Sequence, residues 1–404
     1  MAAVPSPELE VTPGSSLDEV LTRGLDEWRA RGLERTLRPA WDRAGATVRT
    51  EHGAAVDFSS NDYLGLASDA RVARAARDAI ERHGVGAAAS RLIVGDHPEH
   101  TALERALAAF FGAPAALLFS SGYAANIGAL PALVSRGDAI FADALNHASV
   151  IDGCRLSRAA IHVYPHGDVD ALEALLRRER PAFRRALLVT DGVFSMDGDR
   201  APLVELTGLA REYDCWTYVD DAHGAGVIGP SGRGTAEAAG APARADITVG
   251  TLGKAFGAAG AFVYGSRALR DHLLNHARTC VFSTAMPPAQ AAAAREAVRI
   301  VAAEPALRAR LRANAAGLRA GLARARLDPM GEATAHVVPL IVGDADGTMR
   351  VGAALRESGY LVGTIRPPTV PAGTSRLRLT ASAAHTPDHI AGCVAALAAA
   401  IARG

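Results

Sequence analysis

The sequence has 404 residues, which is enough for two or three domains built around one or two full hydrophobic cores. Its 43 Lys and Arg residues balance its 43 Asp and Glu residues, so the charge gives no reason to expect nucleic acid or an anionic membrane as a partner. The four cysteines are widely spaced, and no apolar run is long enough to span a bilayer. We therefore expect a soluble, cytoplasmic protein without a metal site.

The N-terminal region divides into two segments. Residues 1–16 are rich in Pro, Ser, Gly and Glu, which predicts a disordered lead. Residues 17–60 are expected to form an N-terminal arm. Its first part is predicted as an amphipathic helix that ends at Pro39, with an apolar stripe made of Leu17, Val20, Leu21, Leu25 and Trp28.

Residues 61–290 are expected to form a large α/β domain. Short β-rich runs alternate there with helical or loop segments, at 115–120, 139–142, 160–164, 186–190, 215–220, 246–250 and 261–265. Strands that are buried on both faces have such apolar runs, so the pattern predicts a mostly parallel, seven-stranded sheet covered by helices.

Residues 291–404 are expected to form a smaller α+β domain at the C-terminus. Two long helices rich in Ala, Arg and Leu come first, and a final helix is predicted over 387–402. Between them, strands are predicted near 336–342, 360–365 and 375–380.

Candidate functional residues follow four of the predicted strands. The segments are Ser121-Gly122-Tyr123, Asp191 to Gly198, Asp220 to Gly224, and Thr251 to Lys254. Ligands of α/β sheets bind beyond the carboxyl ends of the strands, so these segments should meet in one crevice. Each residue alone could be an ordinary turn or surface residue. Together they offer an amine, a carboxylate and a helix N-terminus, which is what pyridoxal phosphate requires.

Three short motifs resemble other kinds of binding site, but each lacks the neighbouring residues that such a site requires. Gly224 to Gly229 fits G-x-G-x-x-G, but Pro230 follows where a dinucleotide site needs a helix. Gly253-Lys254 lacks the first glycine and the final Ser or Thr of a phosphate-binding P-loop. The segment from His97 to His100 contains a proline and lacks the spacing of a zinc helix, so it is interpreted as a helix start.

Eight ordered motifs resemble those of the α-oxoamine synthases, which are pyridoxal-phosphate enzymes of fold type I. They are SSNDYLGL (59–66), SSGYAAN (120–126), HASVIDG (147–153), DGVFSMDGD (191–199), VDDAHGAGVIGPSGRG (219–234), TLGKAFG (251–257), FSTAMPPAQ (282–290) and IRPPTVPAGTSRLRLTASAAHT (365–386). The resemblance covers nearly the whole chain, from Leu25 to the last helix.

The resemblance implies roles for the residues that would contact the cofactor ring. Lys254 would bind the cofactor as a Schiff base, and Asp220 would face the pyridine nitrogen and keep the ring protonated. His147 would lie on the ring face, with His223 and Ser195 near the phenolic oxygen. Lys254, His147, Asp220 and His223 are thereby the expected catalytic residues.

The resemblance also implies a phosphate site and a dimer. The Gly122 and Tyr123 amides and the Thr251 hydroxyl would hold the phosphate at a helix N-terminus. Residues expected to reach across from a neighbouring subunit are Ser283, Thr284 and Thr369. We therefore expect a homodimer with shared active sites.

The implied reaction joins L-alanine to an acyl thioester, pimeloyl-CoA or its carrier-protein form, with loss of CO2 and the thiol. Arg378 would bind the amino-acid carboxylate, with Asn61 close by and Arg35 near the site. Arg366 is either a surface arginine or a residue that pairs with the distal carboxylate of the acyl chain. The segment Gly84 to Arg91 departs from the family pattern, which leaves the acyl-chain preference open.

Two alternatives remain. A related synthase could use glycine or serine with another acyl-CoA, although Arg366 to Pro371 and Ser382 to His385 look more like the pimeloyl-using branch. A paralogue could also bind the cofactor without turnover. Every residue that the chemistry needs is present, which argues against the second alternative.

Overall fold

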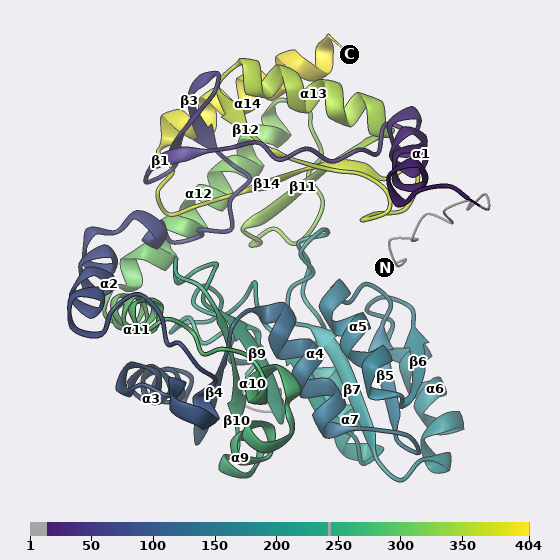
Figure 1. Ribbon diagram of the computed structural model, residues 1–404. Helices are drawn as coiled ribbons and strands as arrows, with labels where there is room; N and C mark the ends of the chain where they lie inside the picture. The colour runs from purple at the N-terminus through teal and green to yellow at the C-terminus, as the bar shows by residue number, and fades with distance from the viewer. Residues whose placement is uncertain (1–13, 241–243, 404) are drawn as a thin grey trace.

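The computed structural model of the protein describes residues 14–240 and 244–403. Figure 1 shows a part built around a large sheet and a second part in which the C-terminal helices cover smaller sheets. Most of the expected disordered lead, residues 1–13, lies outside the described residues.

The large sheet has seven strands in the order β4-β10-β9-β8-β7-β5-β6. The strands are β4 (Ala115–Phe119), β5 (Ala139–Asp143), β6 (Ala160–Tyr164), β7 (Ala186–Asp191), β8 (Trp216–Asp220), β9 (Ile247–Thr251) and β10 (Ala261–Gly265). Only β10 runs antiparallel to its neighbours, β4 and β9. Every residue of β5, β7 and β9 is buried, which explains their continuous apolar runs. The predicted α/β fold with a mostly parallel sheet is confirmed.

Helices cover both faces of this sheet. They are α4 (Gly122–Leu133), α5 (Ala148–Ser157), α6 (Val169–Glu179), α7 (Leu203–Glu212), α8 (Thr235–Ala239), α9 (Arg267–His276) and α10 (Arg278–Val281). Three further helices pack together beside it: α11 (Pro288–Ala303) contacts α2 (Ala70–His83) and α3 (Pro98–Phe111). His97 is the N-cap of α3, as expected of a helix start, and His100 is buried with its Nε2 2.7 Å from the carbonyl oxygen of Met286.

The C-terminal part contains a three-stranded antiparallel sheet in the order β11-β14-β13. Its elements are α12 (Pro305–Arg324), β11 (Val337–Gly343), α13 (Ala345–Glu357), β12 (Tyr360–Leu361), β13 (Gly363–Ile365), β14 (Ser375–Thr380) and α14 (Pro387–Ala402). The single strand predicted over 360–365 is wrong, because β12 and β13 belong to different sheets. Helix α13 was not predicted from the sequence.

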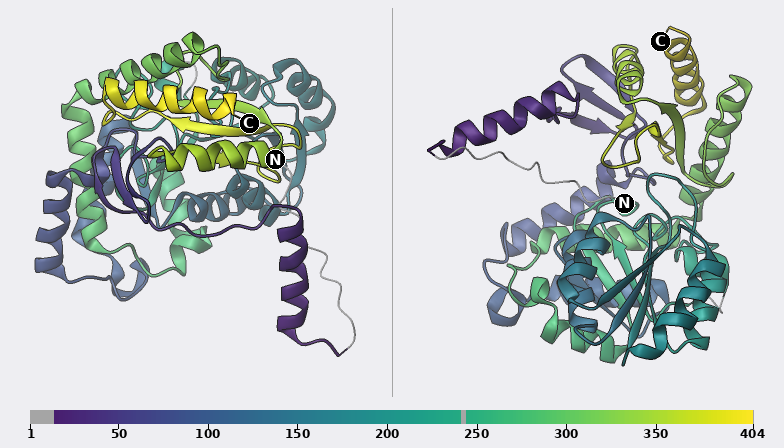
Figure 2. Two further views of the ribbon diagram at one scale, coloured as in Figure 1. Left: turned by 90° about the horizontal axis from the view of Figure 1, so that it is seen from above. Right: turned by 90° about the vertical axis from the view of Figure 1, so that its right-hand side faces the viewer.

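The N-terminal arm differs most from its prediction. Helix α1 (Leu17–Ala30) ends well before Pro39, because Gly32 takes a left-handed conformation (φ 64°) that stops the helix. Strands β1 (Trp41–Ala44), β2 (Thr47–Thr50) and β3 (Gly53–Asp57) follow, and β3 pairs with β12 from the C-terminal part. Helix α1 projects away from the rest of the chain, and its Leu17 and Leu25 are at least half exposed (Figure 2).

Three short helical turns complete the described elements, at Leu66–Ser68, Arg91–Gly95 and Arg180–Ala182. Within residues 14–240 and 244–403, no helix combines the length and the apolar character needed to cross a bilayer.

Candidate active site

The carboxyl ends of the parallel strands meet at a cavity of about 210 Å³. Asp191 and Asp220 are paired at the ends of β7 and β8, and Thr251 is the last residue of β9. The lining residues are Gly122, Tyr123, His147, Ser149, Asp191, Asp220, Ala222, His223, Thr251 and Lys254. The structure therefore brings together seven of the residues singled out in the sequence, from segments spread over 133 positions.

Lys254 supplies the amine of this cavity. Its Nζ lies 2.9 Å from Nε2 of His223, whose Nδ1 lies 2.5 Å from the hydroxyl of Tyr63. Burial lowers the pKa of Lys254 to about 8, although the carboxylates of Asp220 and Asp191 oppose this shift. Burial and the nearby Lys254 hold the pKa of His223 well below its usual value. The amine therefore lies beside a neutral imidazole that is hydrogen-bonded at both nitrogens.

Asp220 is held by uncharged donors. The side-chain amide of Asn126, from α4, donates to its Oδ2 at 2.6 Å, and the backbone N–H of Ala222 donates to its Oδ1 at 3.0 Å. Asn126 is fully buried and accepts in turn from the hydroxyl of Tyr218 at 2.7 Å. These hydrogen bonds fix the orientation of the Asp220 carboxylate at the cavity wall.

Asp191 is the second carboxyl group of the cavity. Burial and the charge of Asp220 raise the pKa of Asp191 well above its usual value. Its Oδ1 accepts from the backbone N–H of His147 at 3.3 Å.

His147 begins α5 as its N-cap. Its Nδ1 lies 2.7 Å from the hydroxyl oxygen of Ser149, and that oxygen also accepts from Asn126 at 2.9 Å. Burial lowers the pKa of His147, so its imidazole is neutral at pH 7. The ring is thus fixed as an uncharged aromatic wall of the cavity.

The N-terminus of α4 forms another wall. Ser121 caps this helix and Gly122 is its first residue, so the positive end of the helix dipole points into the cavity. A Cβ atom on Gly122 would lie 2.8 Å from Cγ2 of Thr251, so only glycine fits without displacement. Tyr123 is 43% exposed and its hydroxyl donates to Asp152. The arrangement suits an anion held by backbone amides and the Thr251 hydroxyl.

Arg378 approaches the cavity residues from β14 of the C-terminal part. Its Nε donates to the carbonyl oxygen of Ser195 at 2.6 Å, and both terminal nitrogens lie 3.2 Å from Oδ1 of Asn61. Asn61 Oδ1 also accepts from the hydroxyl of Tyr63 at 3.2 Å. Ser195 thus joins the site through its backbone oxygen, and its side chain is not among those that line the cavity.

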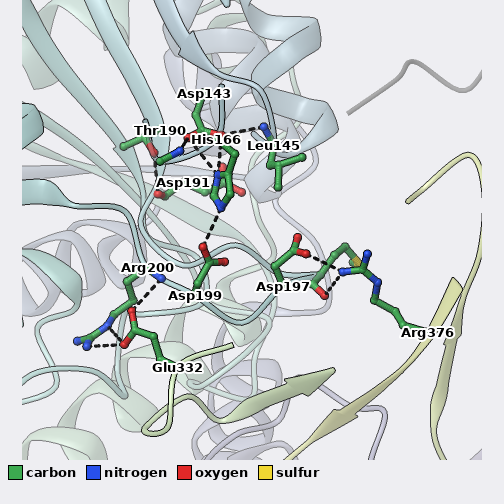
Figure 3. Close-up of polar contacts among 12 residues, drawn as sticks. Asp143, Leu145, His166, Thr190, Asp191, Asp197, Asp199, Arg200, Glu332 and Arg376 are labelled. Atoms are coloured by element: carbon green, nitrogen blue, oxygen red, sulfur yellow. Dashed lines mark hydrogen bonds and ion pairs between the residues drawn. The ribbon is translucent and has the colours of Figure 1, made fainter. Parts of the chain in front are cut away.

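The loop that carries Ser195 is tied to both parts of the molecule (Figure 3). Arg376 Nη1 donates to Asp197 Oδ1 at 2.6 Å, on the side of the C-terminal part. On the other side, His166 lies 3.0 Å from Asp143 and 2.7 Å from Asp199. These two carboxylates raise the pKa of His166 to about 10, so it stays charged at neutral pH.

All five predicted substrate residues lie outside the lining of this cavity, and two of them, Arg35 and Arg366, lie at the N-terminal arm. Arg366 donates from Nη2 to the carbonyl oxygen of Glu34 at 2.7 Å, which fixes it beside the arm. Burial, together with the charges of Arg35 and Arg38, lowers its pKa, and Arg35 itself is exposed. The three arginines form a cationic cluster.

The residues expected from a neighbouring subunit are also absent from the cavity lining within the described chain. Ser283 and Thr369 are half-buried, and Thr284 is exposed. Thr284 forms an isolated β-bridge with Ser90.

Four residues that build the site had no role predicted from the sequence. They are Tyr63, Asn126, Ser149 and Asp191. Asn126 had a usable signal, since a lone amide inside the apolar stretch of a helix must find a buried partner. Lys254 also had a usable signal, because it is the only lysine in the sequence, and the remaining Lys and Arg residues are all arginines.

Comparisons with known proteins agree with this geometry. The family model for aminotransferase class I and II matches residues 54–397. A relative named 8-amino-7-oxononanoate synthase, from Alkalilimnicola ehrlichii, is 52% identical over 384 residues, covering 95% of this chain and 97% of its own. Another of that name, from Anaeromyxobacter dehalogenans, is 52% identical over 375 residues, with 93% and 94% covered.

Solved structures give the same result for the fold. A serine palmitoyltransferase from Sphingomonas wittichii superposes with a TM-score of 0.89 at 31% identity, covering 96% of this chain and 98% of that one. A structure of SPT with a PLP internal aldimine has a TM-score of 0.88 at 31% identity, with 94% and 96% covered. The resemblance found in the motifs is confirmed. The chain belongs to the aminotransferase class I and II family and, within it, to the group of the 8-amino-7-oxononanoate synthases.

Proposed function

We propose that the protein binds pyridoxal phosphate and condenses L-alanine with a pimeloyl thioester, giving 8-amino-7-oxononanoate, CO2 and the free thiol, as a step of biotin biosynthesis. The observation that carries the proposal is the amine of Lys254, hydrogen-bonded to His223 within a cavity that also contains Asp220, with Arg378 close enough for its charge to act on that amine. The names of the relatives at 52% identity support the choice of substrates.

The residues present fit the cofactor. Lys254 offers the amine for a Schiff base and Asp220 the carboxylate for the pyridine nitrogen, with the neutral ring of His147 beside them. The open space at Gly122, which a Cβ would fill against Thr251, would take the phosphate at the N-terminus of α4. When bound, pyridoxal phosphate supplies an electron-accepting ring that stabilises negative charge at the substrate Cα.

Lys254 is suited to move the proton at the substrate Cα. Its pKa of about 8 leaves a substantial neutral fraction at physiological pH, so the amine can accept a proton and return it later. His223 orients the amine through the 2.9 Å contact between Nε2 and Nζ, and Tyr63 holds the other side of that imidazole.

Arg378 is suited to bind the amino-acid carboxylate. Its Nε donates to the carbonyl oxygen of Ser195, Nη1 also donates to the hydroxyl of Thr380, and both terminal nitrogens donate to Asn61 Oδ1. A carboxylate can replace that neutral acceptor with a charge-assisted, two-point contact. This grip would orient the Cα–H and the reacting carbon toward Lys254.

The proposal includes a homodimer that acts in the cytoplasm. Its support is apolar surface near the residues expected to serve a second active site. Val85, Ile93, Val94 and Phe282 are each at least 70% exposed, around the Ser90–Thr284 bridge. Large apolar side chains gathered at a surface are typical of an interface, and a second copy of this chain is the proposed occupant.

The test is a substrate screen with the purified, cofactor-loaded protein. Free thiol and CO2 are measured with alanine, glycine or serine, each combined with pimeloyl-CoA, acetyl-CoA, succinyl-CoA or palmitoyl-CoA. We expect equal amounts of thiol and CO2, with alanine and pimeloyl-CoA as the preferred pair. Lys254→Ala should release neither product.

Other results would replace the proposal. Preference for serine with palmitoyl-CoA would make the chain functionally like its structural neighbour. Cofactor binding without turnover of any pair would mark an inactive relative.

A further inference from the structure

A second cavity of about 270 Å³ lies behind the candidate active site. Its walls come from the loop after β7 and the turn at 227–230 on one side, and from α12 and residues 332–336 on the other. Most of the lining is apolar, with Val193, Val227, Ile228, Leu311 and Ala315 among its residues. It therefore lies between the large sheet part and the C-terminal part.

A histidine with one unpaired ring nitrogen lines this cavity. His336 is only 4% exposed, and its Nε2 is buried and unpaired among the described residues. An unsatisfied buried polar atom costs free energy, so a partner supplied by a ligand would be favoured there. Burial and the charge of Arg378 lower the pKa of His336 to about 3, which keeps the ring neutral.

The open side of the cavity is charged. Arg200 donates to Glu332 at 2.7 Å, and both side chains are about one-third exposed (Figure 3). Arg312 also lines the cavity, is exposed, and makes no ion pair within residues 14–240 and 244–403. The carboxylate at this side, Glu332, is paired with Arg200, so an anionic group of a ligand would meet the guanidinium of Arg312, which has no ion-pair partner among the described residues.

This cavity lies close to the amine of Lys254 but is separate from the cavity around it. His336 packs edge-on against Tyr63, with ring centroids 4.3 Å apart, and Tyr63 leads through His223 to Lys254. None of the residues that line this cavity lines the one around Lys254.

We propose that this cavity is a second ligand site, which binds a small molecule with an apolar body, a hydroxyl group at the buried end and a carboxylate at the open end. The hydroxyl both donates and accepts, so it pairs with Nε2 of His336 in either tautomer. The carboxylate pairs with Arg312. The volume of about 270 Å³ is at the small end for ligand pockets, which suits a molecule of one ring or a short chain.

The test is a calorimetric titration of the cofactor-loaded full chain with a matched pair of acids. Phloretic acid has a phenol, an apolar body and a carboxylate, and hydrocinnamic acid is the same molecule without the hydroxyl. We expect phloretic acid to bind at one site per chain, and about two- to twelve-fold more tightly than hydrocinnamic acid, the effect of one neutral hydrogen bond.

Two variants locate the binding. Ala315→Leu adds a bulky side chain to the cavity wall and should weaken phloretic acid at least tenfold, whereas Ala309→Leu makes the same change on the exposed side of α12 and should have no effect. Arg312→Gln changes only a surface charge and should weaken both acids by a similar factor. That variant keeps the test decisive if Ala315→Leu fails to fold.

Three outcomes would overturn the proposal. They are no binding, equal affinity for the two acids, and displacement of phloretic acid by saturating L-alanine, which would place it in the active site. The titration measures binding directly, so it does not depend on whether the proposed reaction is correct.

Discussion

The pKa of Lys254 gives the sharpest prediction from this structure. Burial lowers it to about 8, against 10.5 for an ordinary lysine. At pH 7 about 10% of the Lys254 amine is then neutral, compared with about 0.03% at the ordinary value, a difference of about 300-fold. Since only the neutral amine is a nucleophile, we expect the cofactor-free protein to be acylated at Lys254 with a midpoint near pH 8.

The assay is competitive labelling with a trace of acetic anhydride, read by mass spectrometry between pH 6.5 and pH 11. Lys254 is the only lysine, so the modified peptide is unambiguous. The same chain unfolded in urea is the control, and its midpoint should return to about 10.5. A folded-state midpoint that matches the unfolded one would refute the argument that burial governs this amine.

Three further predictions test other parts of the site. Gly122→Ala should weaken the binding of pyridoxal phosphate at least about tenfold. Adding Thr251→Ser should restore most of the lost affinity, because this second change removes the Cγ2 atom that the new Cβ would meet at 2.8 Å. An absorbance titration measures the affinity of both variants. His166→Gln should lower the free energy of unfolding by about 1 to 3 kcal/mol near pH 6.5. This deficit should shrink as the pH rises toward 10, because the pKa of His166 is raised in the folded state and the stabilisation is lost as His166 deprotonates. Urea denaturation across that pH range measures the deficit, and a constant deficit would contradict the prediction. Arg366→Ala should raise KM for pimeloyl-CoA about 10- to 150-fold and leave KM for a monocarboxylic acyl-CoA of equal length nearly unchanged; equal effects would show that Arg366 does not recognise the distal carboxylate.

The strands of the large sheet could be predicted from sequence because burial on both faces leaves uninterrupted apolar runs. The end of α1 was predicted at Pro39, although the apolar stripe ends at Trp28 and the helix stops at Ala30. Gly32 ends it through a left-handed backbone conformation, which no periodicity reveals. The β1–β3 strands were missed because they are only four or five residues long and because β3 pairs with β12, about 300 positions away.

The residues of the site likewise fall into those that could be predicted from the sequence and those that could not. Residues directly after strands were found because the topology places strand ends together. Tyr63 and Asn126 were not, because each acts through another side chain: Tyr63 through His223, and Asn126 through Asp220. A residue that only orients a catalytic group carries no chemical signature of its own in the sequence.

The two arginines of β14 have a consequence for how the site is made during protein synthesis. Arg376 and Arg378 lie two residues apart on one strand and hold Asp197 and Ser195, which precede them by about 180 positions. A nascent chain therefore contains every residue of the Lys254 cavity before it contains the arginine expected to bind the amino acid. Since a slip of one residue would turn both arginines to the opposite face, the register of β14 decides whether a finished chain can hold its substrate.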